Sequence, residues 1–245
     1  PFSAEVFATG IGESGAGIGP LAILDRPDGG FIVSGGDNRG SLYRFDAVGG
    51  RALEPAVTLD SPVFDLAWDG NGGLWATSGG GQLLELDPSS LEIINRYGEG
   101  LTQSLAYDAA RGRFYVSSGD GIERFDPVAR NFSHFSNVRV DDLAIAPDGT
   151  LWGSTWPKRG DIVSFDARGR AQVQLRFDAA IDSIAFGRSG TPLAGLLFAG
   201  SRVPSGSGLG ASLFMVDLTT LRTLAIARNG PGAEQLLATA EGRLL

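Results

Sequence analysis

Ile122-Glu-Arg-Phe-Asp126 is a short apolar segment that ends in aspartate, and the chain contains five segments of this kind. The other four are Leu42-Tyr-Arg-Phe-Asp46, Leu83-Leu-Glu-Leu-Asp87, Ile162-Val-Ser-Phe-Asp166 and Leu213-Phe-Met-Val-Asp217. Their aspartates stand 41, 39, 40 and 51 residues apart. Five copies in one register indicate an internal repeat that runs through almost the whole chain.

A second element, a large apolar residue followed by alanine, precedes each of the later four segments. It reads Leu66-Ala-Trp68, Leu105-Ala-Tyr107, Leu143-Ala-Ile145 and Ile184-Ala-Phe186. Turn residues separate these elements, so each repeat predicts four short strands; in the second repeat they are residues 63–68, 74–78, 82–86 and 92–97. Four strands in about 40–45 residues is typical of a β-propeller blade. A helical solenoid would need a 3.6-residue apolar period, and a β-helix would have coils of about half this length.

The two ends of the chain predict how the ring closes. Residues 235–245 repeat the first strand, its turn and the start of the second strand, whereas residues 4–9 resemble an outer strand. We therefore expect an all-β, six-bladed β-propeller of four-stranded antiparallel blades, a single domain over 1–245 whose last blade is closed by both termini. Because the sequence opens at Pro1 without methionine and stops within a strand, we also expect a domain excised from a longer protein.

The blades resemble those of the NHL, YVTN-type and gluconolactonase-like propellers, a superfamily that includes streptogramin lyase. Leu143-Ala-Ile-Ala-Pro-Asp-Gly-Thr-Leu-Trp152 and Leu84-Glu-Leu-Asp-Pro-Ser-Ser-Leu91 carry this resemblance. The superfamily contains hydrolases, lyases and binding modules, so the resemblance implies the fold and leaves the activity open. A lyase of the streptogramin type would be expected to use a histidine on the channel face. The only histidine, His134, is predicted to lie on an outer strand instead.

The composition narrows the possible partners. The 28 acidic and 20 basic residues give a net charge of −8, which argues against nucleic acid and anionic membrane surfaces as partners. The chain has no cysteine and no uninterrupted apolar run long enough to predict membrane insertion. Its 37 glycines fit many tight turns between strands.

The five strand-ending aspartates are predicted to be turn residues that accept backbone N–H bonds. The same interpretation applies to the Pro-Asp-Gly turns at Asp28 and Asp148. It also applies to Asp69-Gly-Asn-Gly-Gly73, for which a calcium loop is the alternative.

The first residues of each innermost strand are expected to surround the mouth of the central channel. They include Asp65, Asp142, Asp182 and Glu234, which we predict as candidate metal ligands. Oxygen ligands without histidine or cysteine would suit Ca²⁺ or Mg²⁺. A water-solvated acidic rim and a catalytic site are the alternatives.

The loops between the second and third strands lie on that same face in the predicted blade. Their candidate contacts for a protein, small-molecule or carbohydrate ligand are Asp37, Arg39, Trp156, Lys158, Arg159 and Arg202. An insertion in the fifth repeat, residues 199–208, belongs to the same face, and variable loops on a rigid scaffold are common recognition sites.

The first hypothesis for function is therefore a non-catalytic binding or scaffold module of a bacterial exported protein, extracellular, at the cell surface or periplasmic. The alternative is a divalent-metal-dependent lactonase or hydrolase of the gluconolactonase-like type, in which the four carboxylates would hold one cation. No separate catalytic residue is identified by the sequence.

Overall fold

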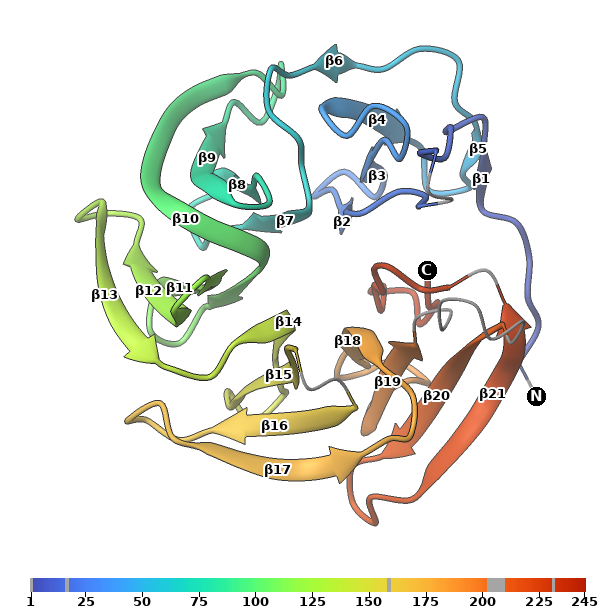
Figure 1. Cartoon of the computed structure of the whole chain (residues 1–245). Helices are drawn as coiled ribbons and strands as arrows, with labels where there is room; N and C mark the ends of the chain where they lie inside the picture. Colours follow the sequence, from blue (N-terminus) through green and yellow to red (C-terminus); the bar gives the residue numbers. More distant parts are fainter. Residues whose placement is uncertain (1, 16–17, 158–159, 202–209, 231) are drawn as a thin grey trace. The chain divides into compact units, whose positions relative to one another are not determined.

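A computed structural model of the chain describes residues 2–15, 18–157, 160–201, 210–230 and 232–245. All regular structure in these ranges is β-strand (Figure 1). No helix within them has the length and apolar character needed to cross a membrane. The chain divides into two compact units, residues 1–103 and residues 104–245, and each is described by itself.

The first unit begins with one complete antiparallel meander of four strands. Its strands pair in the order β2 (Ile23–Asp25), β3 (Phe31–Ser34), β4 (Ser41–Phe45) and β6 (Val57–Thr58). A second meander follows with β7 (Asp65–Trp68), β8 (Leu74–Thr77), β9 (Gly81–Leu86) and the first part of β10 (Ile93–Asp108).

Apolar side chains from both meanders of the first unit form one buried cluster. Its members include Leu24, Ile32, Leu66 and Leu74. The Trp68 indole N–H also donates to the carbonyl of Asp25 at 2.8 Å, which joins the first strands of the two sheets. Burial of these alternating side chains is the main stabilising contribution in the unit.

Strand β10 differs from the sequence prediction because the expected outer strand, residues 92–97, does not end there. It continues to Asp108, and a register shift lies between Tyr97 and Leu101. Gly98 and Gly100 take positive φ angles of 67° and 68° in this interval. Glycine adopts such angles without steric cost, so the chain bulges within the strand and does not leave the sheet. Two predicted blades therefore share one seven-stranded sheet.

The second unit contains three meanders (Figure 1). The first meander contains the end of β10, then β11 (Arg113–Ser118), β12 (Gly121–Asp126) and β13 (Asn131–Ser136), and each strand pairs with the next. The next sheet contains β14 (Val140–Ile145), β15 (Leu151–Thr155), β16 (Asp161–Phe165) and β17 (Ala171–Arg176). The last contains β18 (Ile181–Phe186), β19 (Leu196–Ser201), β20 (Ala211–Asp217) and β21 (Thr223–Gly230).

The two chain ends form little regular structure. Of the expected strand at residues 4–9, only β1 (Ala8–Thr9) is present, and it pairs in parallel with β5 (Gly50–Arg51). Phe7 explains this arrangement, because its ring packs against Phe31 and Phe45 at centroid distances of 5.0 and 6.0 Å. At the other end, the predicted strand–turn–strand is a short antiparallel pairing with a bridge between Ala238 and Leu244.

The strand-ending aspartates are turn residues, as predicted, in four of the five repeats. One carboxylate oxygen accepts two backbone N–H bonds at Asp87, Asp126, Asp166 and Asp217. These bonds, preceded at Asp87 by the larger effect of the Ser89 hydroxyl, favour the ionised form and hold the pKa of each carboxyl below its usual range. At Asp46 the turn bond goes to the backbone carbonyl, from the N–H of Gly49 at 2.9 Å.

The remaining aspartate turns also follow the prediction. Asp69 accepts the N–H groups of Asn71 and Gly73, both at 2.8 Å, and its second oxygen accepts the Trp75 indole N–H at 3.0 Å. Asp148 accepts the N–H of Thr150 at 2.9 Å. Both carboxylates therefore serve the turn in which they stand.

Candidate functional site

Among the predicted site residues that the structure describes, Asp142 is the most buried, with 3% of its surface exposed. It lies on β14, and one carboxylate oxygen accepts the Ser104 hydroxyl and the Leu143 N–H, each at 2.8 Å. The other oxygen accepts the N–H of Ile184 at 2.7 Å. Asp142 thus joins strands of three different sheets, β10, β14 and β18, within the second unit. We call Ser104, Asp142 and these backbone donors the Asp142 belt.

Burial dominates the electrostatics of the Asp142 belt. It raises the pKa of the Asp142 carboxyl to about 6, against the opposing effect of its hydrogen bonds, and the nearby charge of Asp182 raises this pKa further. The carboxylate oxygens already accept three protein donors. The arrangement can hold three strands in register and can take up a proton near neutral pH.

Of the other predicted metal ligands, Asp65 and Asp182 lie on strands and Glu234 does not. Asp65 is buried at the start of β7 in the first unit, where it accepts the N–H of Leu66 at 2.8 Å. Asp182 lies on β18 and Glu234 follows β21, both half-buried in the second unit. No group of three or more His, Cys, Asp or Glu side chains that could hold a metal is present in the described ranges. The four-carboxylate set and its Ca²⁺ or Mg²⁺ ion stay a prediction, as does the lactonase alternative that depends on them.

The predicted ligand contacts are only partly described. Asp37 is exposed and accepts the N–H of Asn38 at 2.7 Å, and the Arg39 guanidinium lies 5.3 Å from the centre of the Phe64 ring. Trp156 donates its backbone N–H to Arg139 at 3.0 Å. Lys158, Arg159 and Arg202 lie outside the described residues, together with most of the insertion. The recognition role of this face stays a prediction.

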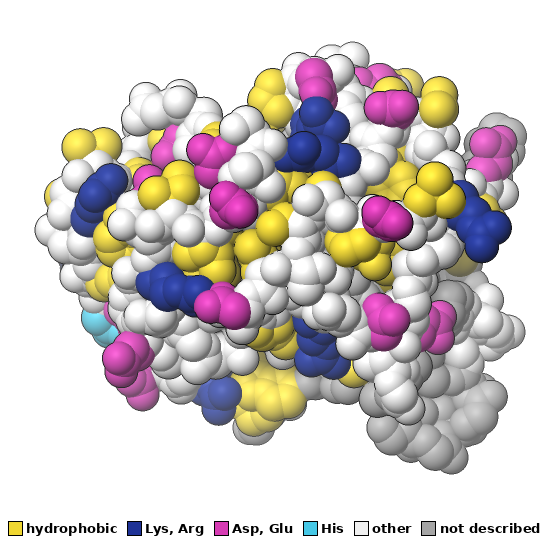
Figure 2. All heavy atoms as spheres, turned by 90° about the horizontal axis from the view of Figure 1, so that it is seen from above, with side chains coloured by type: hydrophobic (Ala, Val, Ile, Leu, Met, Phe, Trp, Pro, Cys, Tyr) yellow, Lys and Arg dark blue, Asp and Glu magenta, His cyan; other side chains and the backbone are white. Residues whose placement is uncertain are grey.

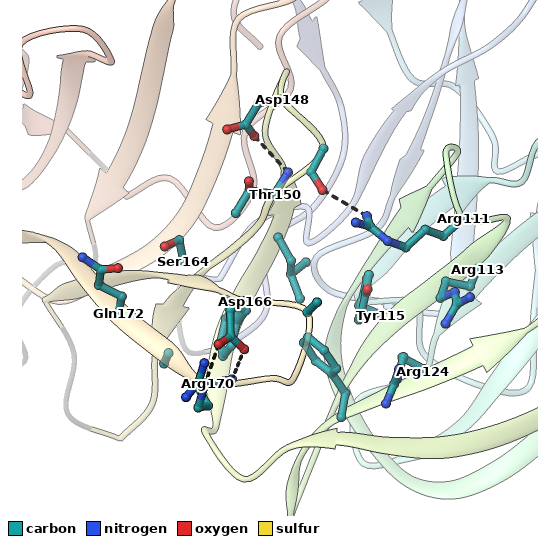
Figure 3. Close-up of a pocket in the computed structure, with 16 residues that line it drawn as sticks. Arg111, Arg113, Tyr115, Arg124, Asp148, Thr150, Ser164, Asp166, Arg170 and Gln172 are labelled. Atoms are coloured by element: carbon teal, nitrogen blue, oxygen red, sulfur yellow. Dashed lines mark hydrogen bonds and ion pairs between the residues drawn. The ribbon is translucent and has the colours of Figure 1, made fainter.

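A different place in the second unit forms an open cleft of about 790 Å³. It lies between the β10–β13 meander and the β14–β17 sheet, beside the turns that precede β11, β15 and β17. Four arginines and two aspartates are among its lining residues: Arg111, Arg113, Arg124, Arg170, Asp148 and Asp166. We call it the arginine cleft. Figure 3 shows Arg111, Arg113, Tyr115 and Arg124 on one side and Asp148, Thr150, Ser164, Asp166 and Gln172 on the other.

Strand geometry explains how the arginines come together. Arg113 and Tyr115 are two residues apart on β11 and therefore point to the same face of the sheet. Arg124 on β12 is the register partner of Tyr115, which places it on that face as well. Arg111 reaches the cleft from the turn before β11 and lies 3.4 Å from the carbonyl of Gly149 across it.

The floor of the cleft is the edge of an apolar core shared by the two sheets. Phe135 packs against Tyr115 at 4.8 Å and against Phe165 at 6.1 Å between ring centroids. Gly169, in the turn before β17, lies close to the end of β13. A Cβ at Gly169 would collide with the carbonyl of Phe135, and the Gly169 carbonyl accepts the Ser136 hydroxyl at 2.7 Å. Its φ of 78° also favours glycine. The turn and the neighbouring sheet are therefore held at a fixed spacing.

The arginine cleft is lined by more basic than acidic side chains, although the chain as a whole is acidic. On the face shown in Figure 2, basic side chains lie interspersed with acidic ones. In the cleft, two of the four arginines have a carboxylate partner: Arg111 pairs with Asp108 at 2.7 Å and Arg170 with Asp166 at 2.6 Å. For Arg113 and Arg124, the buried Nε atoms have no hydrogen-bond partner among the residues that the structure describes.

The sequence analysis did not identify this site. The usable signal was the pair Arg113 and Tyr115 at a two-residue spacing together with Arg124 across the next turn, because this pattern places all three on one face of a hairpin. His134, in contrast, lies where it was predicted, on the outer strand β13 at the edge of its sheet.

Comparisons with known proteins support the fold. No family model matches the chain, and no curated protein matches it. Among solved structures, virginiamycin B lyase from Staphylococcus aureus superposes with a TM-score of 0.60 at 15% identity, over 93% of this chain and 77% of that one.

Two extracellular domains of putative hybrid two-component systems from B. thetaiotaomicron are also similar. One gives a TM-score of 0.63 at 11% identity over 95% of this chain, and the other gives 0.56 at 15% identity over 93%. This chain spans only 31% and 37% of their lengths. At these identities the likeness shows the fold alone: the chain has a β-propeller fold.

Proposed function

We propose that this protein is a non-catalytic binding module that recognises a small ligand in the arginine cleft. The observation that carries the proposal is the cleft itself, a hollow of about 790 Å³ with charged and polar side chains around an apolar floor. Ligand-binding pockets commonly have about 300–1,000 Å³ and a few placed polar groups. The Asp142 belt, by comparison, uses its carboxylate oxygens for bonds between strands.

The likeness to extracellular domains of bacterial two-component systems supports the setting. We propose an exported protein, extracellular, at the cell surface or periplasmic, in which the propeller acts as a sensor or scaffold. We further propose that its repeats form a single six-bladed propeller; the first three repeat spacings of 41, 39 and 40 residues and the four-stranded meanders support this. Further ligand contacts at Asp37 and Arg39 in the first unit, and at Trp156 in the second unit, belong to the same proposal.

The test closes the cleft without changing its charge. Thr150 lines the cleft and is half-buried in a turn, so Thr150→Trp should fill part of the hollow. Thr219→Trp is the matched control, because Thr219 is an exposed turn residue outside the cleft. The wild type and both variants would be screened by thermal shift against sugars, amino acids, nucleotides and organic acids at millimolar concentration.

We expect at least one compound to raise the Tm of the wild type and of Thr219→Trp, and to have little effect on Thr150→Trp. A bound ligand at about 100 times its Kd stabilises by about 2.7 kcal/mol, or at least about 5 °C for a chain of this length. The proposal fails if no compound stabilises the wild type, or if the shift persists in Thr150→Trp.

A further inference from the structure

Arg113 and Arg124 distinguish the arginine cleft from an ordinary polar hollow. Both are half-buried, and the Nε atom of each is shielded from solvent without an acceptor in the described ranges. Arg124 donates from Nη2 to the carbonyl of His134 at 3.3 Å, and its guanidinium lies 5.0 Å from the centre of the Phe135 ring. A guanidinium has five N–H donors and stays charged at all ordinary pH values. Most of the N–H donors of these two guanidinium groups have no acceptor within the described ranges.

Two carboxylates of this region, Asp126 and Asp166, are already engaged. Asp126 feels the charge of Arg113, which contributes to its low pKa, but its carboxylate accepts the N–H groups of Val128 and Ala129 at 2.9 Å. Asp166 pairs with Arg170 on the opposite wall. The cleft therefore retains positive charge although the whole chain carries a net charge of −8.

Several charged side chains act on the hydroxyl group of Tyr115. Burial raises the pKa of its phenol most and the charge of Asp108 raises it further, whereas the charges of Arg111, Arg113 and Arg124 each lower it. All three guanidinium groups are thus close enough to act on the same hydroxyl group. Arg111 is paired with Asp108 at 2.7 Å, so an oxyanion placed beside Tyr115 would interact chiefly with Arg113 and Arg124, in a partly desolvated setting where such contacts are strong.

We propose that the arginine cleft binds a small acidic ligand in which one oxyanion, a carboxylate or a phosphate ester, is carried on a hydroxylated body such as a sugar. This inference rests on the proposed function. The oxyanion lies against Arg113 and Arg124, whose forked donors match it.

The opposite wall determines the rest of the ligand. Thr150, Ser164 and Gln172 present hydroxyl and amide groups there, as Figure 3 shows. Ser164 and Gln172 are register partners on β16 and β17, so they lie next to each other on one face. Short neutral donors and acceptors of this kind suit hydroxyl groups better than a second charge, and the aromatic floor suits the apolar face of a sugar ring.

The experiment compares three probes that differ only at one carbon: glucuronate, glucose 6-phosphate and glucose. Binding of each would be measured by isothermal titration calorimetry at low and at physiological ionic strength. We expect glucuronate, glucose 6-phosphate or both to bind at least about tenfold more tightly than glucose, and to bind more weakly at the higher salt concentration. The acidic probe that binds more tightly shows whether the cleft prefers a carboxylate or a phosphate ester.

The variants are Arg113→Gln and Arg124→Gln, with Arg168→Gln as the matched control. Arg168 is exposed in the β16–β17 turn and does not line the cleft, so the control removes the same charge nearby. Each cleft variant should weaken binding of the acidic probe about tenfold or more, whereas the control should change it less than about twofold. Arg124→Lys retains the charge without the fork and should give an intermediate loss. Far-UV circular dichroism and Tm values identify any variant that does not fold.

The outcomes separate this inference from the proposed function. The inference is overturned if both acidic probes bind no better than glucose, or if folded cleft variants bind them as the wild type does. Binding of a neutral compound that Thr150→Trp abolishes would in that case leave the proposed function standing. If an acidic probe binds Thr150→Trp as tightly as it binds the wild type, both the inference and the proposed function are overturned.

Discussion

The Asp142 belt and the arginine cleft lie in the same unit and use charge in opposite ways. Asp142 has 3% of its surface exposed, and its oxygens accept donors from β10, β14 and β18. Arg113 and Arg124 stand at an open cleft, and their Nε atoms have no acceptor within the described part of the chain. The carboxylate oxygens of Asp142 are occupied by donors of the fold, whereas Arg113 and Arg124 are the groups that we propose a ligand meets.

This difference indicates which charges belong to structure and which to recognition. A buried carboxylate with three donors stabilises the strands that supply those donors, and its removal leaves the donors unpaired. A guanidinium without an acceptor gains most when an anion arrives. Perturbed ionisation alone does not mark a functional site, because the carboxyl with the raised pKa here is the structural one.

The largest effect is expected for Asp142→Ala. It leaves the Ser104 hydroxyl and the Leu143 and Ile184 N–H groups without their carboxylate acceptor in a buried site. Unpaired buried donors cost about 1–3 kcal/mol each, so we expect a loss of about 3 kcal/mol or more and a fall in Tm of roughly 10 °C. Urea and thermal unfolding would measure it. Asp178→Ala, at an exposed aspartate of the same unit, should change the Tm by less than about 2 °C. An equal change in both variants would contradict a bridging role for Asp142.

A smaller effect concerns the pH dependence of the belt. The pKa of Asp142 is raised to about 6, above the value of an unfolded aspartate, so the folded state holds the proton more tightly. Its stabilising contribution is therefore complete below about pH 4 and is lost as the pH rises through 6. Asp142→Asn does not titrate. The stability of the wild type relative to this variant should fall by roughly 2 kcal/mol between pH 4 and pH 7.5, measured by urea unfolding. A constant difference across this range would show that Asp142 is not perturbed, and the charge facing it, Asp182, would be the next residue to vary.

The smallest effect belongs to a charge that is satisfied at the surface. His134 lies 2.9 Å from Glu123 and 2.8 Å from Asn137, and these contacts raise its pKa above 6.5. Because it is the only histidine, an NMR titration of its ring protons follows one group. Glu123→Gln should lower the midpoint towards 6.5, and Glu92→Gln, at an exposed residue elsewhere, should leave it unchanged. Any stability from the pair is present below pH 6.5 and is lost as the pH rises through the folded pKa.

Much of the fold could be read from local sequence. The repeated aspartates predicted the turns after the third strands, and the alternation of apolar residues predicted the four-stranded meanders. Both features depend on residues close together in the chain, where an Asx turn or a period of two has a local cause. Residues 4–9 were different: their pairing with Gly50 and Arg51 depends on where Phe7 finds a buried aromatic surface, which local sequence does not specify.

The same limit explains the two charged sites. The sequence by itself determined that Asp142 starts an inner strand and that Arg113 and Tyr115 share a face, because strand geometry is local. Only the tertiary structure decided that Asp142 accepts hydrogen bonds from neighbouring strands. One of these donors is Ser104, which lies 38 residues away in the sequence. It also decided that Arg113 and Arg124 face a second sheet across an open cleft. Burial, and hence the availability of each charge to a ligand, depends on packing between sheets, and no residue carries that information in its own neighbourhood.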